Sequence, residues 1–351
     1  MTDISFDHLK RVKPASVHKL DHAVTMVQSS PNLQHMAAWS GKGEVTIVSN
    51  GQISNRLSLG EVGGMEMSVD NSAQQLAHVL PESSHAVILD VNTGDRALID
   101  VGFGSKVEAC RFDSKGRIWI TRAIEDHFVI ELRTPPDWAL QASAPFSGDG
   151  FSGAGSITWP GSADYVLAQI YSGQSENETF VCEWNGAEQI AVRRVDAISE
   201  TENFPLVSPL GSEAISIDHT SMQLSRIAWP YEEIIEQVPW PDFDEEEAED
   251  ERPGFAACFL DDVNAMLSSY EGRLFVLHTR SMRFADEISV AGFEPFPGSQ
   301  KYPTLSDVEN LVVSNLLNIG RCGDFVAAFF GPDYRTTSPQ MALIPIRTFL
   351  G

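Results

Sequence analysis

Positive charge is scarce in this sequence. Its 351 residues include 24 Lys and Arg against 49 Asp and Glu, which gives a formal net charge of −25. Binding to a nucleic-acid backbone or to an anionic membrane surface requires an excess of basic side chains. The composition therefore argues against nucleic acid and membrane as partners, and it favours a protein partner that is neutral or basic.

Long hydrophobic runs are also lacking. No stretch approaches the roughly 18 consecutive apolar residues of a membrane-spanning helix. The N-terminal segment MTDISFDHLKRVKP has no apolar core of the kind found in a signal peptide. We therefore expect a cytoplasmic protein.

Cysteines are few and widely spaced. Cys110, Cys182, Cys258 and Cys322 are separated by 64 to 76 residues and form no Cys-x-x-Cys pair. A metal or redox motif needs closer spacing. Free, buried thiols are the expectation for all four.

Common catalytic and cofactor motifs are missing as well. The sequence contains no G-x-S-x-G, H-E-x-x-H, Walker A or EF-hand pattern. GDGFSG at residues 148–153 has the spacing G-x-G-x-x-G, but a dinucleotide site needs a helix directly after it, and AGSITWPG reads as a strand and a turn. We predict no cofactor and no metal site, and we interpret residues 148–153 as a connection.

What the sequence does contain is a series of short runs rich in Val, Ile, Phe and Trp. They are four to eight residues long and are separated by Gly, Asn, Asp and Pro, while sustained helical spacing is hard to find. Asn50-Gly51, Thr93-Gly94 and Asn185-Gly186 each lie between two such runs, where glycine supplies the positive φ of a tight hairpin. The chain is therefore predicted to be all-β.

The hairpins recur with a longer period, because another pair of strands precedes each of them. The first strands of these four-stranded units start near Ala23, Gly64, Val107, Gly155, Phe204, Phe255 and Asn310. A spacing of about 40 to 55 residues is typical of a β-propeller blade. We predict a single seven-bladed β-propeller of four-stranded blades over residues 1–351. Six or eight blades, or two stacked β-sandwiches, are the alternatives, since units four to six are irregular.

The last unit, which ends in MALIPIRTFLG, has room for only three strands. The segment from about Val12 to Leu20 has no unit of its own. We predict that this N-terminal segment completes the final blade and closes the ring, which would remove open sheet edges.

One unit resembles known propeller families. Residues 107–133, VEACRFDSKGRIWITRAIEDHFVIELR, contain D-x-x-G-x-I-W through Asp113, Gly116, Ile118 and Trp119. This hairpin is similar to blades of the NHL, YWTD, streptogramin-lyase and gluconolactonase-like propellers. The resemblance covers one blade well and implies the propeller fold. It transfers no functional residue, because the motif builds the turn.

An acidic run, DFDEEEAEDE, lies between units five and six. Residues 242–254 are expected to form an inter-blade loop. A run of like charge is by default a solvated, disordered loop. In the alternative interpretation, aromatic anchors among acids bind a basic protein surface. The residues predicted to do so are Trp229, Tyr231, Glu232, Glu233, Glu236, Trp240, Asp242, Phe243, Asp244, Glu245, Glu246 and Glu247.

The resulting hypothesis is a non-catalytic propeller whose acidic surface binds a basic protein. It could be an adaptor or, in a bacterial setting, an immunity protein that neutralises a cationic toxin. The competing hypothesis is a metal-dependent, lactonase-like hydrolase. That activity would need inward-facing acids that hold a hard cation, and Glu66, Glu108 and Asp261 near first strands are the candidates.

Overall fold

The computed structural model describes most of the chain. The described residues are 9–60, 62–125, 127–146, 153–158, 164–172, 176–186, 188–196, 198, 206–218, 220–229, 233–241, 252–269, 272–293, 315–331 and 338–350. For residues 63–66, 153–158, 171–172, 176, 255 and 315 only the backbone is considered.

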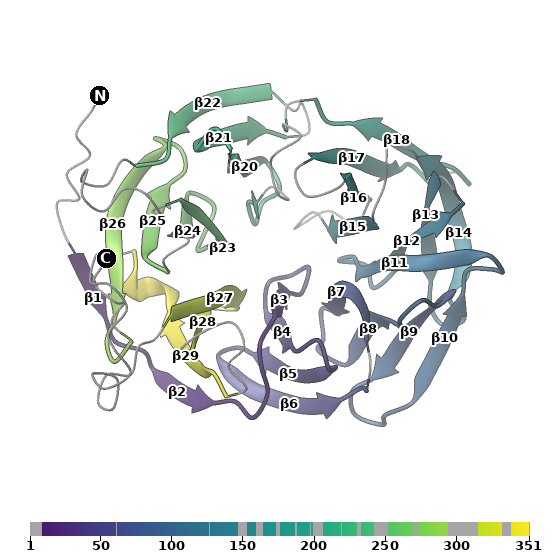
Figure 1. Ribbon diagram of the computed structural model, residues 1–351, viewed down its shortest axis with the longest axis horizontal. Coiled ribbons are helices and arrows are strands. Elements are labelled where there is room, and N and C mark those ends of the chain that lie inside the picture. Colours follow the sequence, from purple (N-terminus) through teal and green to yellow (C-terminus); the bar gives the residue numbers. More distant parts are fainter. Residues whose placement is uncertain are drawn as a thin grey trace.

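Seven β-sheets form a closed ring, and each sheet is one blade (Figure 1). Blade one contains β3 (Met26–Ser29), β4 (His35–Trp39), β5 (Glu44–Ser49) and β6 (Gln52–Ser58). Blade two contains β7 (Gly63–Val69), β8 (Gln75–Val79), β9 (His85–Asp90) and β10 (Arg96–Asp100). Blade three contains β11 (Ser105–Phe112), β12 (Ile118–Ile124), β13 (His127–Thr134) and β14 (Ala139–Phe146).

The remaining blades follow the same order from the inner to the outer strand. Blade four contains β15 (Gly153–Thr158), β16 (Tyr165–Ser172), β17 (Glu176–Trp184) and β18 (Ile190–Arg194). Blade five contains β19 (Leu206–Val207), β20 (Glu213–Asp218), β21 (Gln223–Ala228) and β22 (Glu233–Pro239). Blade six contains β23 (Pro253–Phe259), β24 (Asn264–Ser269), β25 (Leu274–His278) and β26 (Arg283–Val290). Blade seven contains β27 (Asn315–Cys322), β28 (Phe325–Gly331) and β29 (Gln340–Pro345), which precedes the 3₁₀ helix η2 (Ile346–Thr348).

The fourth strand of blade seven comes from the other end of the sequence. β2 (Ser16–Lys19) pairs antiparallel with β29, with Ser16 opposite Leu343. The prediction of seven four-stranded blades closed by the N-terminal segment is thus confirmed, and every predicted blade start lies within a few residues of an inner strand. One strand was not predicted: β1 (Leu9–Val12) pairs parallel with β26 and gives blade six a fifth strand.

The burial pattern explains why the sequence shows no helical periodicity. The middle strands are buried on both faces between neighbouring blades, as in β5, whereas the outer strand β6 alternates between exposed and half-buried residues. Buried apolar side chains form seven clusters, one in each interface between neighbouring blades. The described part of the chain contains no helix long and apolar enough to cross a membrane.

The four cysteines are free and buried, as predicted. Burial raises the pKa of the Cys182 thiol, and it raises the pKa of Cys258 to about 12 and that of Cys322 to about 11. All three groups remain protonated thiols at neutral pH.

Glycine permits close approach where blades seven and one meet. A Cβ at Gly320 would lie 2.5 Å from both Met36 Sδ and Val27 Cγ1. Gly51, which has a φ of +74°, would place a Cβ 2.5 Å from the Phe325 ring. Both contacts join the first blade to the last, so these glycines allow the ring to close.

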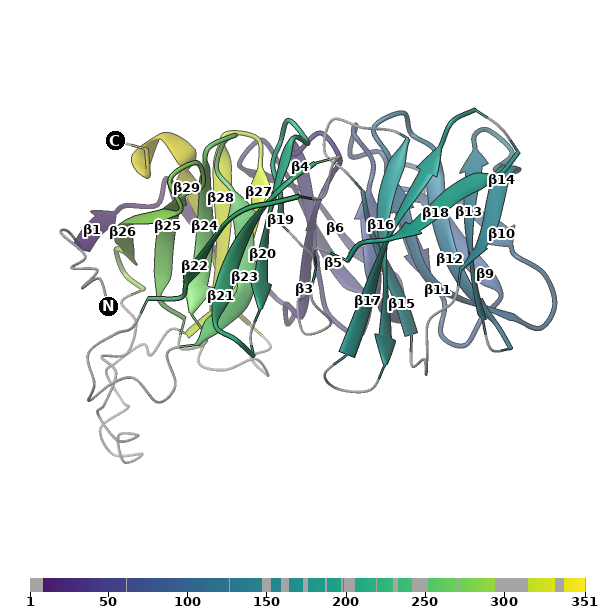
Figure 2. The same ribbon diagram turned by 90° about the horizontal axis from the view of Figure 1, so that it is seen from above.

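Each blade has two ends. Because strands within a blade are antiparallel, the turns after the first and third strands lie at one end, and those after the second and fourth strands lie at the other. Equivalent ends of the blades lie together around the ring (Figure 2). We call the first end the bottom face and the other end the top face; in the view of Figure 2 the bottom face, which includes η2, is uppermost. The segments that connect strands at the bottom face are residues 30–34, 50–51, 70–74, 91–95, 113–117, 135–138, 159–164, 185–189, 208–212, 229–232, 260–263, 279–282, 323–324 and 346–351. The segments that connect strands at the top face are residues 20–25, 40–43, 59–62, 80–84, 101–104, 125–126, 147–152, 173–175, 195–205, 219–222, 240–252, 270–273, 291–314 and 332–339. In both sets the structure places only the described residues.

Hydrogen bonds link the bottom turns of successive blades. Gly323 N of blade seven donates to Leu33 O of blade one at 2.7 Å. Asn32 N donates to Asn71 Oδ1 of blade two at 2.9 Å, and Asn71 Nδ2 donates to Ser114 O of blade three at 2.9 Å. The first-to-second-strand turns of four consecutive blades are therefore tied to one another.

His78 in β8 makes stability depend on pH. Its side chain is fully buried, Nε2 has no hydrogen-bond partner among the described residues, and burial lowers the pKa of the imidazole below 6.5. The unfolded chain therefore takes up a proton first as the pH falls, so stability is retained above about pH 6.5 and declines below it, by at most about 1.4 kcal/mol per pH unit for this group. The free energy of unfolding, measured with urea at pH values from 5 to 7.5, should depend less steeply on pH for His78→Leu than for the wild type. An equal slope in both proteins would contradict the assignment.

Candidate functional site

Trp229 and Trp240, which were expected to bind a partner, are buried in the interior. Trp229 is 6% exposed and packs with residues of blades four and five. Trp240 is 4% exposed, and its ring lies edge-on to Phe275 and Phe284 of blade six, with centroids 5.8 and 5.5 Å apart. The expectation that these indoles are surface anchors is therefore wrong. Each one fills the interface between its own blade and a neighbour.

The other predicted residues of the acidic region are described only in part. Glu233 and Glu236 lie on β22, the outer strand of blade five. Glu233 is exposed, and the Glu236 carboxylate is 3.8 Å from Arg226 Nη2. Pro253 and Gly254, expected within the inter-blade loop, belong to β23. The other predicted partner-binding residues lie outside the described residues: Tyr231, Glu232, Asp242, Phe243, Asp244, Glu245, Glu246 and Glu247.

Charge is distributed unequally between the segments of the two faces. The top-face segments contain 22 Asp and Glu against five Lys and Arg. The bottom-face segments contain ten Asp and Glu against four Lys and Arg. Eight of the top-face acids belong to residues 240–252, which connect the top ends of β22 and β23. The excess of acids is a property of the sequence of these segments, because only Asp21, Glu82, Glu125 and Asp196 among their acids lie within the described residues.

Sequence reasoning missed an exposed aromatic residue on the top face. Phe103 connects blades two and three and is as exposed as in an extended chain, at 108%. Gly102 and Gly104 on either side have φ values of +100° and +78°, so they form a turn that no other residue type adopts readily. Nearby in the same face, Lys106 Nζ is 3.0 Å from Glu82 Oε1. The motif Gly-Phe-Gly within an inter-blade connection is the signal that could have identified Phe103.

Of the three acids proposed for a hydrolase metal site, the two whose side chains are described, Glu108 and Asp261, do not lie together. Glu108 lies in β11 of blade three with its carboxylate 3.5 Å from Lys106 Nζ, and burial raises its pKa. Asp261 lies in a bottom turn of blade six and accepts hydrogen bonds from Val263 N and Asn264 N, both at 2.8 Å. Glu66 is in β7, and its side chain lies outside the described part. Among the described residues no group of three or more His, Cys, Asp or Glu side chains is placed to hold a metal ion.

The D-x-x-G-x-I-W hairpin builds a buried polar network. Asp113 is fully buried, and its Oδ1 accepts from Lys115 N and Arg117 N at 2.9 and 3.0 Å. Its Oδ2 accepts from Arg117 Nε at 2.7 Å and from Trp119 Nε1 at 3.2 Å. Arg117 then reaches blade four, where Nη2 donates to Asp164 Oδ1 at 3.0 Å. The motif therefore builds its turn, as predicted, and through Arg117 it also links blade three to blade four, which was not predicted.

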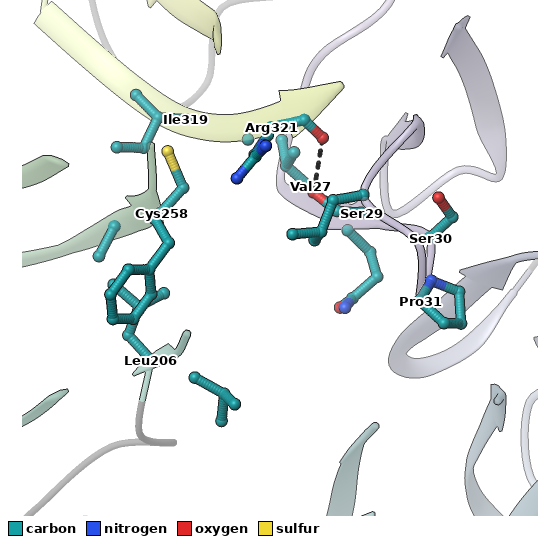
Figure 3. A pocket seen from close by; sticks show the side chains of 14 residues that line it. Val27, Ser29, Ser30, Pro31, Leu206, Cys258, Ile319 and Arg321 are labelled. Carbon is teal, nitrogen blue, oxygen red and sulfur yellow. Dashed lines mark hydrogen bonds between the residues drawn. The ribbon is translucent and has the colours of Figure 1, made fainter. Parts of the chain in front are cut away.

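A cavity lies in the central channel towards the bottom face (Figure 3). Its volume is ≈ 190 Å³, and it is bordered by the bottom ends of the inner strands of blades five, six, seven and one. Most of its described lining is apolar, and Arg321 is the one charged side chain among the described residues that border it. Sequence reasoning missed this site, because its residues come from four blades and range from Val27 to Arg321.

Comparison with known proteins supports the fold. No protein-family model matches the sequence, and no curated protein matches it either. Among solved structures, the β-propeller domain of Myceliophteria thermophila Cps50 (Swd1) is similar, with a TM-score of 0.59 and 10% sequence identity over 94% of this chain and 98% of that one. This likeness shows a β-propeller. It does not extend to the particular propeller families that residues 107–133 resemble.

Proposed function

We propose that this propeller is a non-catalytic binding scaffold whose top face associates with a basic protein. The observation that carries the proposal is the charge of the segments that connect strands at the top face, whose sequence contains 22 acidic against five basic residues. Acidity needed only for solubility would have no reason to gather at one end of the ring. A surface that attracts a cationic partner has such a reason.

Charge and an apolar anchor would contribute differently to this association. Clustered acids speed the encounter with a basic surface and orient the two proteins, but exposed ion pairs add little affinity. Affinity comes from a few aromatic or large apolar side chains that become buried at the centre of an interface. Phe103 supplies such a side chain on the top face. An immunity protein that covers the basic active surface of a toxin is a specific form of this function.

Four substitutions in the acidic run test the role of charge. The variant Glu245→Gln, Glu246→Gln, Glu247→Gln and Glu249→Gln should lose most of the basic proteins that the wild type retains when it is used as bait in its native lysate. Retention by the wild type should also decrease between 0.1 and 1 M NaCl, because the Debye length falls from about 10 to about 3 Å. The retained proteins are identified by mass spectrometry. Phe103→Ala should weaken binding of the same proteins about 10-fold or more.

Matched bottom-face variants serve as controls. Asp95→Asn, Asp137→Asn, Glu188→Gln and Asp324→Asn remove four exposed charges from the bottom face, and Leu210→Ala truncates a residue that is 69% exposed there. Both should leave binding unchanged. Equal loss in the top and bottom charge variants would reduce the effect to net charge. Retention of the same basic partners by the top-face variant would contradict the proposal.

A further inference from the structure

Arg321 is a cation in the central channel without an anionic partner among the described residues. Its Nε donates to Gly323 O at 3.2 Å, and its carbonyl accepts from Ser29 Oγ at 2.8 Å. Nη1 is buried and makes no hydrogen bond to the described part of the protein. Figure 3 shows the guanidinium directed into the cavity between Cys258 and Val27. A guanidinium N–H that is buried without an acceptor is costly, and an anion in the cavity would stabilise the positive charge of this half-buried side chain.

The nearby thiols do not supply the missing negative charge. The positive charge of Arg321 acts to lower the pKa of Cys258 and of Cys322, but burial outweighs it and raises these pKa values to about 12 and about 11. Both groups are neutral at pH 7. The remaining polar side chains of the lining, Gln28, Ser29 and Ser30, are uncharged.

The rest of the lining determines what kind of anion fits. Val27, Leu206, Ala257, Phe259 and Ile319 present an apolar surface to the same space. The ≈ 190 Å³ volume exceeds the roughly 150 Å³ of a protein cavity that accommodates benzene. A planar guanidinium matches a carboxylate, which it binds through two parallel hydrogen bonds, whereas a phosphate dianion usually recruits several cationic or backbone donors.

We propose that the channel cavity binds a carboxylate with a short apolar body, with the Arg321 guanidinium as its counter-charge. The carboxylate belongs either to a free short-chain acid or to the C-terminus of a peptide that enters through the bottom face. The site is independent of the top face, because it uses other residues at the opposite end of the ring. Failure of one proposal therefore leaves the other standing.

Calorimetric titration of the full-length protein with 4-methylpentanoate tests the site. We expect saturable binding of the acid. The amide 4-methylpentanamide should bind about 10-fold or more weakly, because its neutral carbonyl replaces the charged carboxylate that accepts hydrogen bonds from Arg321. Arg321→Met should weaken binding of the acid about 10- to 100-fold while keeping an unbranched side-chain stem. Arg283→Met, an exposed site on β26, changes the net charge equally and should have no effect. Ala257→Met, which fills the cavity, should abolish binding without removing the cation.

Peptides and phosphate distinguish the remaining possibilities. Saturable binding of acetyl-Gly-Leu with a free C-terminus but not of its C-terminal amide, lost in Arg321→Met, would support the site and assign its ligand to peptides. If Arg321→Met does not fold, two results still test the carboxylate site. They are the comparison of acid with amide in the wild type and the binding measured for Ala257→Met. The proposal is overturned if neither acid binds, if acid and amide bind equally, or if inorganic phosphate binds more tightly than both acids in an Arg321-dependent manner.

Discussion

Replacing Asp113 with alanine should lower the free energy of unfolding by about 3–5 kcal/mol, because it removes a buried carboxylate that pairs with the buried Arg117 guanidinium at 2.7 Å. Asp113 is fully buried and accepts four hydrogen bonds, two from backbone N–H groups and two from the Arg117 and Trp119 side chains. Without the carboxylate, Arg117 still donates to Asp164 and lies 4.8 Å above the Trp184 ring. The substitution also removes the Asp113 oxygen that accepts the hydrogen bond of Trp119 Nε1, a group of a fully buried side chain. Urea unfolding followed by tryptophan fluorescence measures the loss.

Asp70 provides the matched control for this substitution. It occupies the equivalent first-to-second-strand turn of blade two, where its Oδ1 accepts from Gln74 N and Gln75 N at 2.8 and 2.9 Å. Its side-chain hydrogen bonds remain within the turn, so Asp70→Ala should cost only about 1–2 kcal/mol. Adding Arg117→Met to Asp113→Ala should restore part of the lost stability, because the double variant no longer buries a guanidinium that has lost one of its carboxylate partners. Equal losses for Asp70→Ala and Asp113→Ala would show that the inter-blade network contributes nothing beyond the turn.

The sequence predicts the blades well because short local patterns determine which strands are neighbours. Each hairpin has its own turn signal, and Asn50-Gly51 adopts positive φ at both residues as the pattern requires. Antiparallel neighbours in sequence are then neighbours in the sheet. β1 could not be predicted from such patterns, because Leu9–Val12 pairs in parallel with residues 287–290 and no local turn connects the two strands. The closing strand β2 was found only because blade seven had an unfilled position.

Candidate functional residues are harder to predict because the neighbouring blade decides their exposure. Trp240 follows a proline-flanked strand beside an acidic run, which suggests a surface position, yet Phe275 and Phe284 of the next blade cover it. Arg321 precedes an ordinary tight turn in the sequence, and only the ring brings it beside Cys258 and Val27. Local patterns therefore locate strands and turns, while the contents of the channel and the interfaces depend on contacts between blades.

The segments of the two faces also differ in length. Bottom turns are short and hydrogen-bonded to one another from blade seven through blade three, and Arg117 continues this linkage to Asp164 of blade four. The longest connections of the ring, residues 240–252 and 291–314, belong to the top face. Binding residues commonly lie on loops that a rigid scaffold positions. This division agrees with a scaffold whose bottom turns stabilise the ring and whose top segments meet the partner.

Removing residues 1–20 should abolish the cooperative fold, a loss of at least about 5 kcal/mol and comparable with the whole stability of many domains. The deletion takes away β2, and with it the backbone bonds from Ala15 N to Leu343 O at 2.8 Å and from Leu20 N to Pro339 O at 2.9 Å. It also removes Leu20, which is 1% exposed in the cluster between blades seven and one. β29 becomes an open edge able to pair with another chain. We expect loss of the near-ultraviolet circular dichroism signal and concentration-dependent association in analytical ultracentrifugation.

A circular permutant separates closure of the ring from simple loss of residues. Lys10 Nζ donates to Phe349 O at 2.9 Å, so the C-terminal segment lies beside β1, and a short Gly-Ser linker can join Gly351 to Leu9 in a chain that starts at Asp21. This permutant keeps β1 and β2 in place and should unfold cooperatively as a monomer. Removing residues 1–13 deletes β1 alone and should cost only about 1.5–3 kcal/mol, mainly through Val12, which is 3% exposed. If the chain lacking residues 1–20 unfolded as cooperatively as the permutant, the N-terminal strand would not be what closes the ring.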